Sequence, residues 1–129
     1  MSREAVVAAT LTAVQGVSGV KGAERGLKDG TELAATDLPY GYVHTPTQTT
    51  EVLRGRQRSR TLDVEVLVWF DGTPTEAEAL LELVRTALET DSGILALVER
   101  SDVTEDSIVP FPETTRQAIL LSAQTGRIE

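Results

Sequence analysis

The sequence of 129 residues contains no cysteine and only one histidine. A chain without cysteine can form no disulfide, no thiolate metal site and no cysteine nucleophile. A single histidine also provides few of the nitrogen ligands that zinc and other transition metals prefer. Thiol chemistry is therefore excluded, and a transition-metal centre is disfavoured.

Aromatic residues and long apolar runs are also scarce. The chain has two Phe, two Tyr and one Trp, so its core must consist mainly of Val, Leu, Ile and Ala. No window approaches the roughly 18 apolar residues of a membrane span, and the N-terminal segment lacks the pattern of a signal peptide. With 40% hydrophobic and 25% charged residues, we expect one soluble, unsecreted globular domain over residues 1–129.

Positive charge is in deficit, because 12 basic residues face 20 acidic ones and the net charge is −8. This balance argues against general nucleic-acid binding. The deficit is uneven: residues 1–62 hold eight basic and six acidic residues, whereas residues 63–129 hold four and fourteen. Either the second half is simply an acidic, solvated surface, or the molecule has one positive and one negative face. The second arrangement would suit head-to-tail packing of identical copies.

Two segments have the spacing of amphipathic helices. Ser2 is placed to cap the first, whose apolar residues recur at helical intervals over residues 5–17. The second covers about residues 74–90, and Thr73 with Glu76 can form a capping box at its start. Its apolar stripe consists of Ala77, Leu80, Leu81, Val84 and Leu88.

The clearest predicted strand covers residues 61–70, where apolar and polar residues alternate. Its buried face would consist of Leu62, Val64, Val66, Val68 and Phe70. The opposite face ends with Leu67 and Trp69, so we expect that end to be covered as well.

Further strands are predicted from composition and position in the chain. They cover residues 39–53, with an interruption at Pro46, and residues 116–125, with a frayed tail at 126–129. Residues 94–98 can form a strand or a short helical turn, and segments 18–38 and 99–115 are predicted to be loops. The fold class is therefore α+β, with two layers: a mainly antiparallel four-stranded sheet with two amphipathic helices on one face.

Few side chains suggest catalysis. His44 could serve as a general base, but a structural role in its strand is the favoured interpretation. Asp63 and Glu65 share one face of a strand and could bind a metal or act as an acid–base pair, although such outer-face carboxylates are usually solvated. The acids of the predicted loop lack the spacing of a calcium-binding loop: Asp102, Glu105 and Asp106.

Four arginines within seven positions are the most unusual local feature: Arg54, Arg56, Arg58 and Arg60. In an extended chain their side chains would all point to one side. Guanidinium groups suit carboxylates and phosphates. Three interpretations are open: a soluble hairpin tip, a contact with an acidic neighbouring subunit or tube, and a nucleic-acid contact, which the overall charge disfavours.

The order of these segments resembles that of the tail terminator family of long-tailed bacteriophages. The similarity lies in a helix at 5–17, a strand entered through Leu38 and Pro39, and a strand from Arg60 with the pattern R-x-L-x-V-x-V-x-V. A helix opening with T-P-T-E-A-E-A-L at Thr73 and a strand at 118–125 complete it.

That resemblance implies a virion structural protein whose copies form a ring, commonly of six. The ring caps the tail tube, stops its polymerisation and joins it to the head or neck. Its partners would be the tail tube protein and a head–tail connector, with no specific nucleic-acid binding and no membrane. It would be assembled in the host cytoplasm and lie at the head-proximal end of the tail. The family has no catalytic motif, so the resemblance implies no enzyme, cofactor or metal.

Two alternatives share the predicted plan. One is a head–tail joining protein of the same fold. Terminators of contractile tails, which belong with this first alternative, also have a similar order of segments. The other is a small ligand-binding or enzymatic α+β domain with His44, or Asp63 and Glu65, in a cleft. The scarcity of catalytic side chains and the uneven charge favour the structural protein.

We predict that the protein needs no metal, because its sequence lacks clustered metal ligands. Dialysis against a chelator should leave the melting temperature and the assembly state unchanged. A loss of stability that one divalent ion restores would contradict this prediction.

Overall fold

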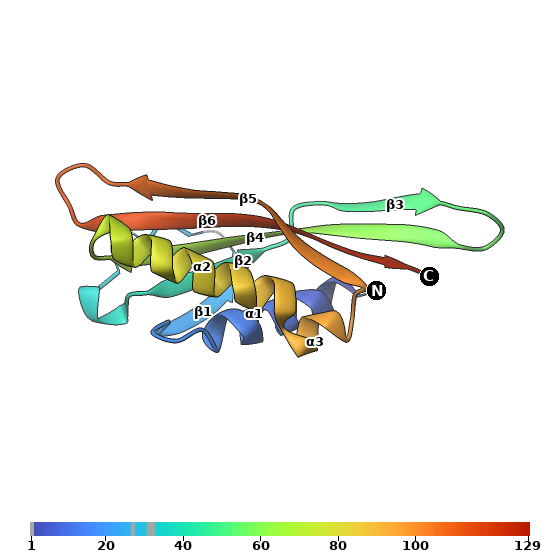
Figure 1. Ribbon diagram of the computed structural model, residues 1–129, viewed down its shortest axis with the longest axis horizontal. Coiled ribbons are helices and arrows are strands. Elements are labelled where there is room, and N and C mark those ends of the chain that lie inside the picture. The colour runs from blue at the N-terminus through green and yellow to red at the C-terminus, as the bar shows by residue number, and fades with distance from the viewer. Residues whose placement is uncertain (1, 27, 31–32) are drawn as a thin grey trace.

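The computed structural model describes residues 2–26, 28–30 and 33–129. A twisted sheet forms one layer, and the helices pack on one of its faces (Figure 1). In chain order the elements are α1 (Arg3–Gln15), β1 (Gly22–Arg25), a 3₁₀ turn (Ala35–Asp37), β2 (Tyr40–His44), β3 (Gln48–Val52), β4 (Arg58–Asp71), α2 (Pro74–Thr90), α3 (Ser92–Leu95), β5 (Arg100–Pro110) and β6 (Arg116–Ile128). The α+β class is as predicted. Residues 94–98 form the end of α3 and a turn, so the helical-turn alternative is right and the strand alternative for this segment is wrong.

Within the described residues the sheet has six strands, not the four predicted. Its order is β1-β2-β4-β6-β5, and β3 pairs with β4 beyond the end of β2. It is mixed, because β1 runs parallel to β2 while the other pairs are antiparallel. Two expected loops contain the additional strands. β1 has four residues, too few to show a period, and β5 is an edge strand with mostly exposed side chains.

The predicted buried face of β4 is confirmed. Four of its residues are at most 1% exposed and pack with the apolar stripe of α2, while Phe70 lies partly buried at the margin: Leu62, Val64, Val66 and Val68. The capping box of α2 is present, because Thr73 Oγ1 accepts from Glu76 N–H and the Glu76 carboxylate accepts from Thr73 N–H. These hydrogen bonds to the charged form lower the pKa of Glu76.

The second face of the sheet is covered at one end only, as Leu67 and Trp69 led us to expect. Trp69 is 4% exposed and packs with Leu38 and Tyr42. Its indole N–H donates to Lys28 O at 3.2 Å, and Arg116 donates to Gly30 O at 3.1 Å. The described part of segment 18–38 therefore contributes a strand and a cover for this aromatic cluster.

The other end of the sheet projects from the body as a three-stranded extension, which we call the arm (Figure 1). It consists of residues 48–62, where β3 pairs with β4, and residues 125–129, where the end of β6 pairs with the other side of β4. The expected fraying of residues 126–129 was wrong, because β6 continues to Ile128 and Glu129 exchanges backbone hydrogen bonds with Arg58 at 2.8 Å.

We predict that Val66→Asp abolishes folding. Val66 is 0% exposed between the sheet and the helices, and an unpaired charge buried there costs several kcal/mol. Glu65→Gln, one residue away on the opposite face, should change the free energy of unfolding by no more than about 0.5 kcal/mol. Circular dichroism during thermal melting distinguishes the two, and a Val66→Asp protein that melts like the wild type would refute the assigned core.

Candidate subunit interface

The arm separates the four arginines into two groups. Arg54 and Arg56 lie in the turn between β3 and β4, where Gly55 has a φ of 65° and Leu53 N–H donates to Gln57 O. Arg58 and Arg60 follow in β4 and share the face of Leu62, the face that the helices cover farther along. The picture of four side chains on one side of an extended chain was therefore wrong, because the turn reverses the chain among them.

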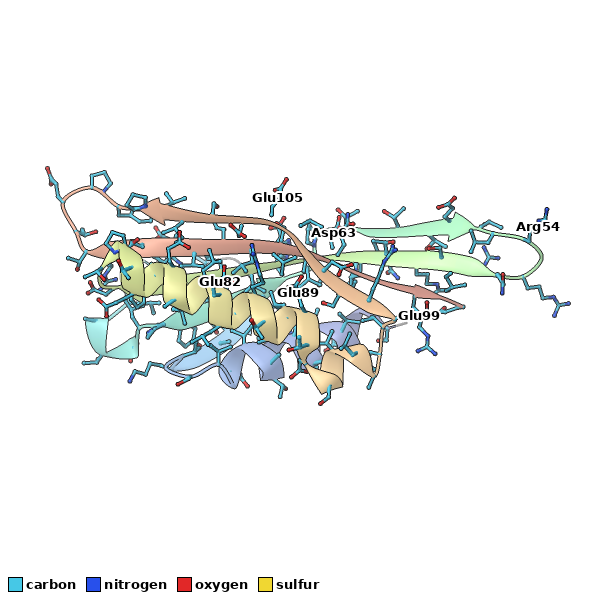
Figure 2. All side chains as sticks on the ribbon, in the orientation of Figure 1. Arg54, Asp63, Glu82, Glu89, Glu99 and Glu105 are labelled. Atoms are coloured by element: carbon cyan, nitrogen blue, oxygen red, sulfur yellow. The ribbon has the colours of Figure 1, made fainter. Side chains whose placement is uncertain are left out.

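Three of these arginines have no internal ion-pair partner within the part of the chain that the structure describes. Arg54, Arg56 and Arg58 are exposed, and Figure 2 shows Arg54 at the far tip of the arm. Arg60 is partly buried, and its Nε lies 3.3 Å from a carboxylate oxygen of Glu129. The charge of Arg60 is thus paired within the molecule, whereas the charges of the other three arginines are not paired with any residue that the structure describes.

The arm gathers positive charge that the body lacks. The arm contains five basic residues and two acidic ones, a net charge of +3, and the remaining sequence contains seven and eighteen, a net charge of −11. The fifth basic residue is Arg127 of β6, which lies directly opposite Arg60 in the register. The charge is therefore divided between a basic arm and an acidic body. This division does not follow the two halves of the sequence.

A hollow of about 630 Å³ lies on the uncovered face of the sheet, between the arm and the aromatic cluster. Its lining combines acidic, hydroxyl and apolar side chains, including Glu65, Glu105, Ser122 and Leu120. The register explains this grouping: Glu65 of β4 lies opposite Ser122 of β6, which in turn lies opposite Glu105 of β5. Asp63 lies two residues from Glu65 on the same face and lines an adjoining hollow.

The acids that we assigned to a loop belong to strand β5. A register shift between Val103 and Glu105 places Glu105 over the hollow, whereas Asp106 forms an ion pair with Arg85 of α2. In Figure 2, Glu105 and Asp63 lie on the side of the sheet away from the helices. Sequence reasoning found Asp63 and Glu65 but not their proximity to Glu105, since only the pairing of β5 with β6 brings them together.

Within the part of the chain that the structure describes, the side chain of His44 has no hydrogen-bond or ion-pair partner. It is exposed at the end of β2, opposite Glu65 in the register. Among the described side chains, no group of three or more His, Asp or Glu residues is arranged to hold a metal ion. The described helices include none with the length and apolarity to cross a membrane. The lining of the hollow is suited to an electrostatic contact with a cationic partner.

Comparison with known proteins identifies a similar fold but no family. No family model matches the chain, and no curated protein matches its sequence. Among solved structures, the fold is similar to that of a chain in the virion of a native gene transfer agent particle. The two share 12% sequence identity with a TM-score of 0.60, over 98% of this chain and 96% of the other. The similarity extends over nearly the whole of both chains and concerns the fold.

We predict that the exposed arginines of the arm contribute little to folding. The triple variant Arg54→Gln, Arg56→Gln and Arg58→Gln should change the free energy of unfolding by less than about 0.5 kcal/mol, because surface residues without partners contribute little. Urea unfolding followed by circular dichroism measures this change. A loss of several kcal/mol would mean that these arginines stabilise the monomer.

Proposed function

We propose that the chain is a virion structural protein whose copies form a ring that caps a phage tail tube. The ring would stop tube polymerisation and join the tube to the head or neck. The observation that carries this proposal is the end-to-end similarity of the fold to a chain of the gene transfer agent virion. The segment pattern that resembles tail terminators supports the more specific role at the end of the tube.

Uneven charge supports assembly from identical copies. In a cyclic ring each subunit presents one surface to the next copy and a different surface to the previous one. A basic arm and an acidic body provide two such surfaces, and opposite charges can meet at every interface of the ring. Arginine suits this contact because its planar fork can pair with both oxygens of a carboxylate.

Unpaired strand edges also support assembly. Among the described strands β3 pairs only with β4, so the outer edge of the arm leaves backbone hydrogen-bonding groups free to pair with another chain. The edge strand β5 has a register shift and ends at Pro110, two features that discourage edge pairing, and the described residues of β3 have neither. We therefore place the arm, rather than β5, at the contact with another subunit or with the tube.

The proposed partners are further copies of the chain in a ring of about six, the tail tube protein and a neck protein. The proposed location is the head-proximal end of the tail, and we propose no catalytic activity. If the protein is instead a head–tail joining subunit, its rings will bind the neck but will not stop tube growth.

We predict that changing Arg54, Arg56, Arg58 and Arg60 together to Gln leaves the protein folded but impairs assembly. Exposed ion pairs contribute only about 0–1 kcal/mol each, so the effect depends on four changes repeated around a ring. Circular dichroism checks folding, mass photometry detects rings, and electron microscopy with tail tubes detects capping.

A matched control removes four cations from the body instead of the arm: Arg3, Lys21, Arg25 and Lys28, each changed to Gln. This variant should assemble and cap tubes like the wild type. If the arm variant also forms rings and caps tubes at wild-type concentrations and moderate salt, the arm is not the contact. Wild-type rings that fail to stop tube growth would contradict the capping function itself.

A further inference from the structure

The arm has an uncovered cationic face. Arg58 lies opposite Val52 of β3, and Arg60 lies opposite Arg127 of β6, all on the face that continues from Leu62. The helices cover this face over the body and reach only the base of the arm, where Leu62 is buried (Figure 1). Val52 is 64% exposed, so the face combines positive charge with an exposed apolar side chain.

The pairing of Arg60 with Arg127 is unfavourable within one molecule. Like charges directly opposite each other on neighbouring strands destabilise a sheet. Glu129 offsets part of this repulsion through Arg60, but the arm remains positive overall. Carboxylates of a partner placed over this face would attract both guanidinium groups and so offset their mutual repulsion.

The hollow on the sheet has the complementary character. Asp63, Glu65 and Glu105 form no ion pair within the described ranges of the chain, whereas Asp106 beside them is paired with Arg85. Leu120, 36% exposed, adds an apolar patch to the hollow. The hollow and its neighbour thus present unpaired carboxylates beside Leu120, and the arm presents unpaired Arg58 opposite Val52, with Arg54 and Arg56 in the adjoining turn.

These two surfaces cannot meet within one molecule. Both lie along the continuous strand β4: the arm ends at Leu62, and Asp63 and Glu65, which line the adjoining hollow and the hollow itself, follow it on the opposite face of the strand. The five residue pairs of β3 and β4 extend the arm about 17 Å away from the body, at about 3.4 Å per residue. Arginines at its tip can therefore reach only the hollow of another molecule.

We propose that the arm of one copy docks on the uncovered sheet face of the next copy, with Arg54, Arg56 and Arg58 facing Asp63, Glu65 and Glu105. Such a contact joins two different surfaces and therefore propagates around a ring. The proposal rests on the proposed function and adds the acceptor surface to it. The proposed partner is a second copy of this chain, because one sequence supplies both complementary surfaces.

Charge reversal tests the docking. One variant carries Arg54→Glu, Arg56→Glu and Arg58→Glu, and the other carries Asp63→Lys, Glu65→Lys and Glu105→Lys. Each alone should raise the apparent dissociation constant of self-association at least about tenfold, since each exposed ion pair contributes up to about fivefold. A one-to-one mixture of the two should recover assembly at moderate salt, because the reversed charges are complementary again. Sedimentation velocity and mass photometry measure these states.

The matched control reverses three carboxylates outside the hollow: Glu78→Lys, Glu82→Lys and Glu113→Lys. This control should assemble like the wild type. If the carboxylate reversal fails to fold by circular dichroism, the milder set Asp63→Asn, Glu65→Gln and Glu105→Gln replaces it. If the arginine reversal fails to fold, the variant Arg54→Gln, Arg56→Gln and Arg58→Gln replaces it. A smaller loss of assembly is expected in either case.

The results of these experiments test arm docking and tube capping separately. If wild-type rings form and cap tubes but neither reversal weakens them, the docking is wrong and the capping function stands. If both reversals weaken assembly and the mixture does not recover it, the two surfaces do not contact each other and the docking is also wrong. A wild-type chain that stays monomeric at every concentration overturns both proposals.

Discussion

The antiparallel pairing of β4 with β6 is the interaction on which the rest of the structure depends. It runs without interruption from Ser59 opposite Ile128 to Asp71 opposite Arg116. Every other strand joins this pair directly or through one neighbour: β2 and β3 share one edge of β4, β5 pairs with β6, and β1 pairs with β2. One continuous ladder therefore builds both the body and the arm, and the orientation of the arm is fixed by the core.

What changes along the ladder is the kind of side chain that β4 presents. From Leu62 onward the face toward the helices is apolar and closes the core, whereas the arm before it presents Arg58 and Arg60 on the same face. The opposite face is covered by the aromatic cluster around Trp69 at one end and is open around Glu65. A folded body thus leaves a basic arm and an acidic hollow exposed, and both are suited to contact with other copies.

The elements with a strong internal pattern could be predicted from the sequence. Alternation identified the buried face of β4, and the capping residue Thr73 located the start of α2. β5 could not be predicted, because most of its side chains are exposed, with only Ser101 buried, and its register shift between Val103 and Glu105 breaks any period. The arginine cluster was visible in the sequence, but the acidic hollow was not, since it requires the pairing of β4, β6 and β5. The single-domain expectation and the roles of the arginines remain predictions.

The most direct test of arm docking uses the absence of native cysteine. Arg54→Cys protein is mixed with Glu105→Cys protein, the mixture is oxidised, and the yield of disulfide-linked heterodimer is measured by non-reducing electrophoresis and mass spectrometry. Arm docking predicts a high yield for this pair and a low yield when Glu82→Cys, on the helix side of the body, replaces Glu105→Cys. Equal yields with the two partners would show that the arm does not dock on the uncovered face of the sheet.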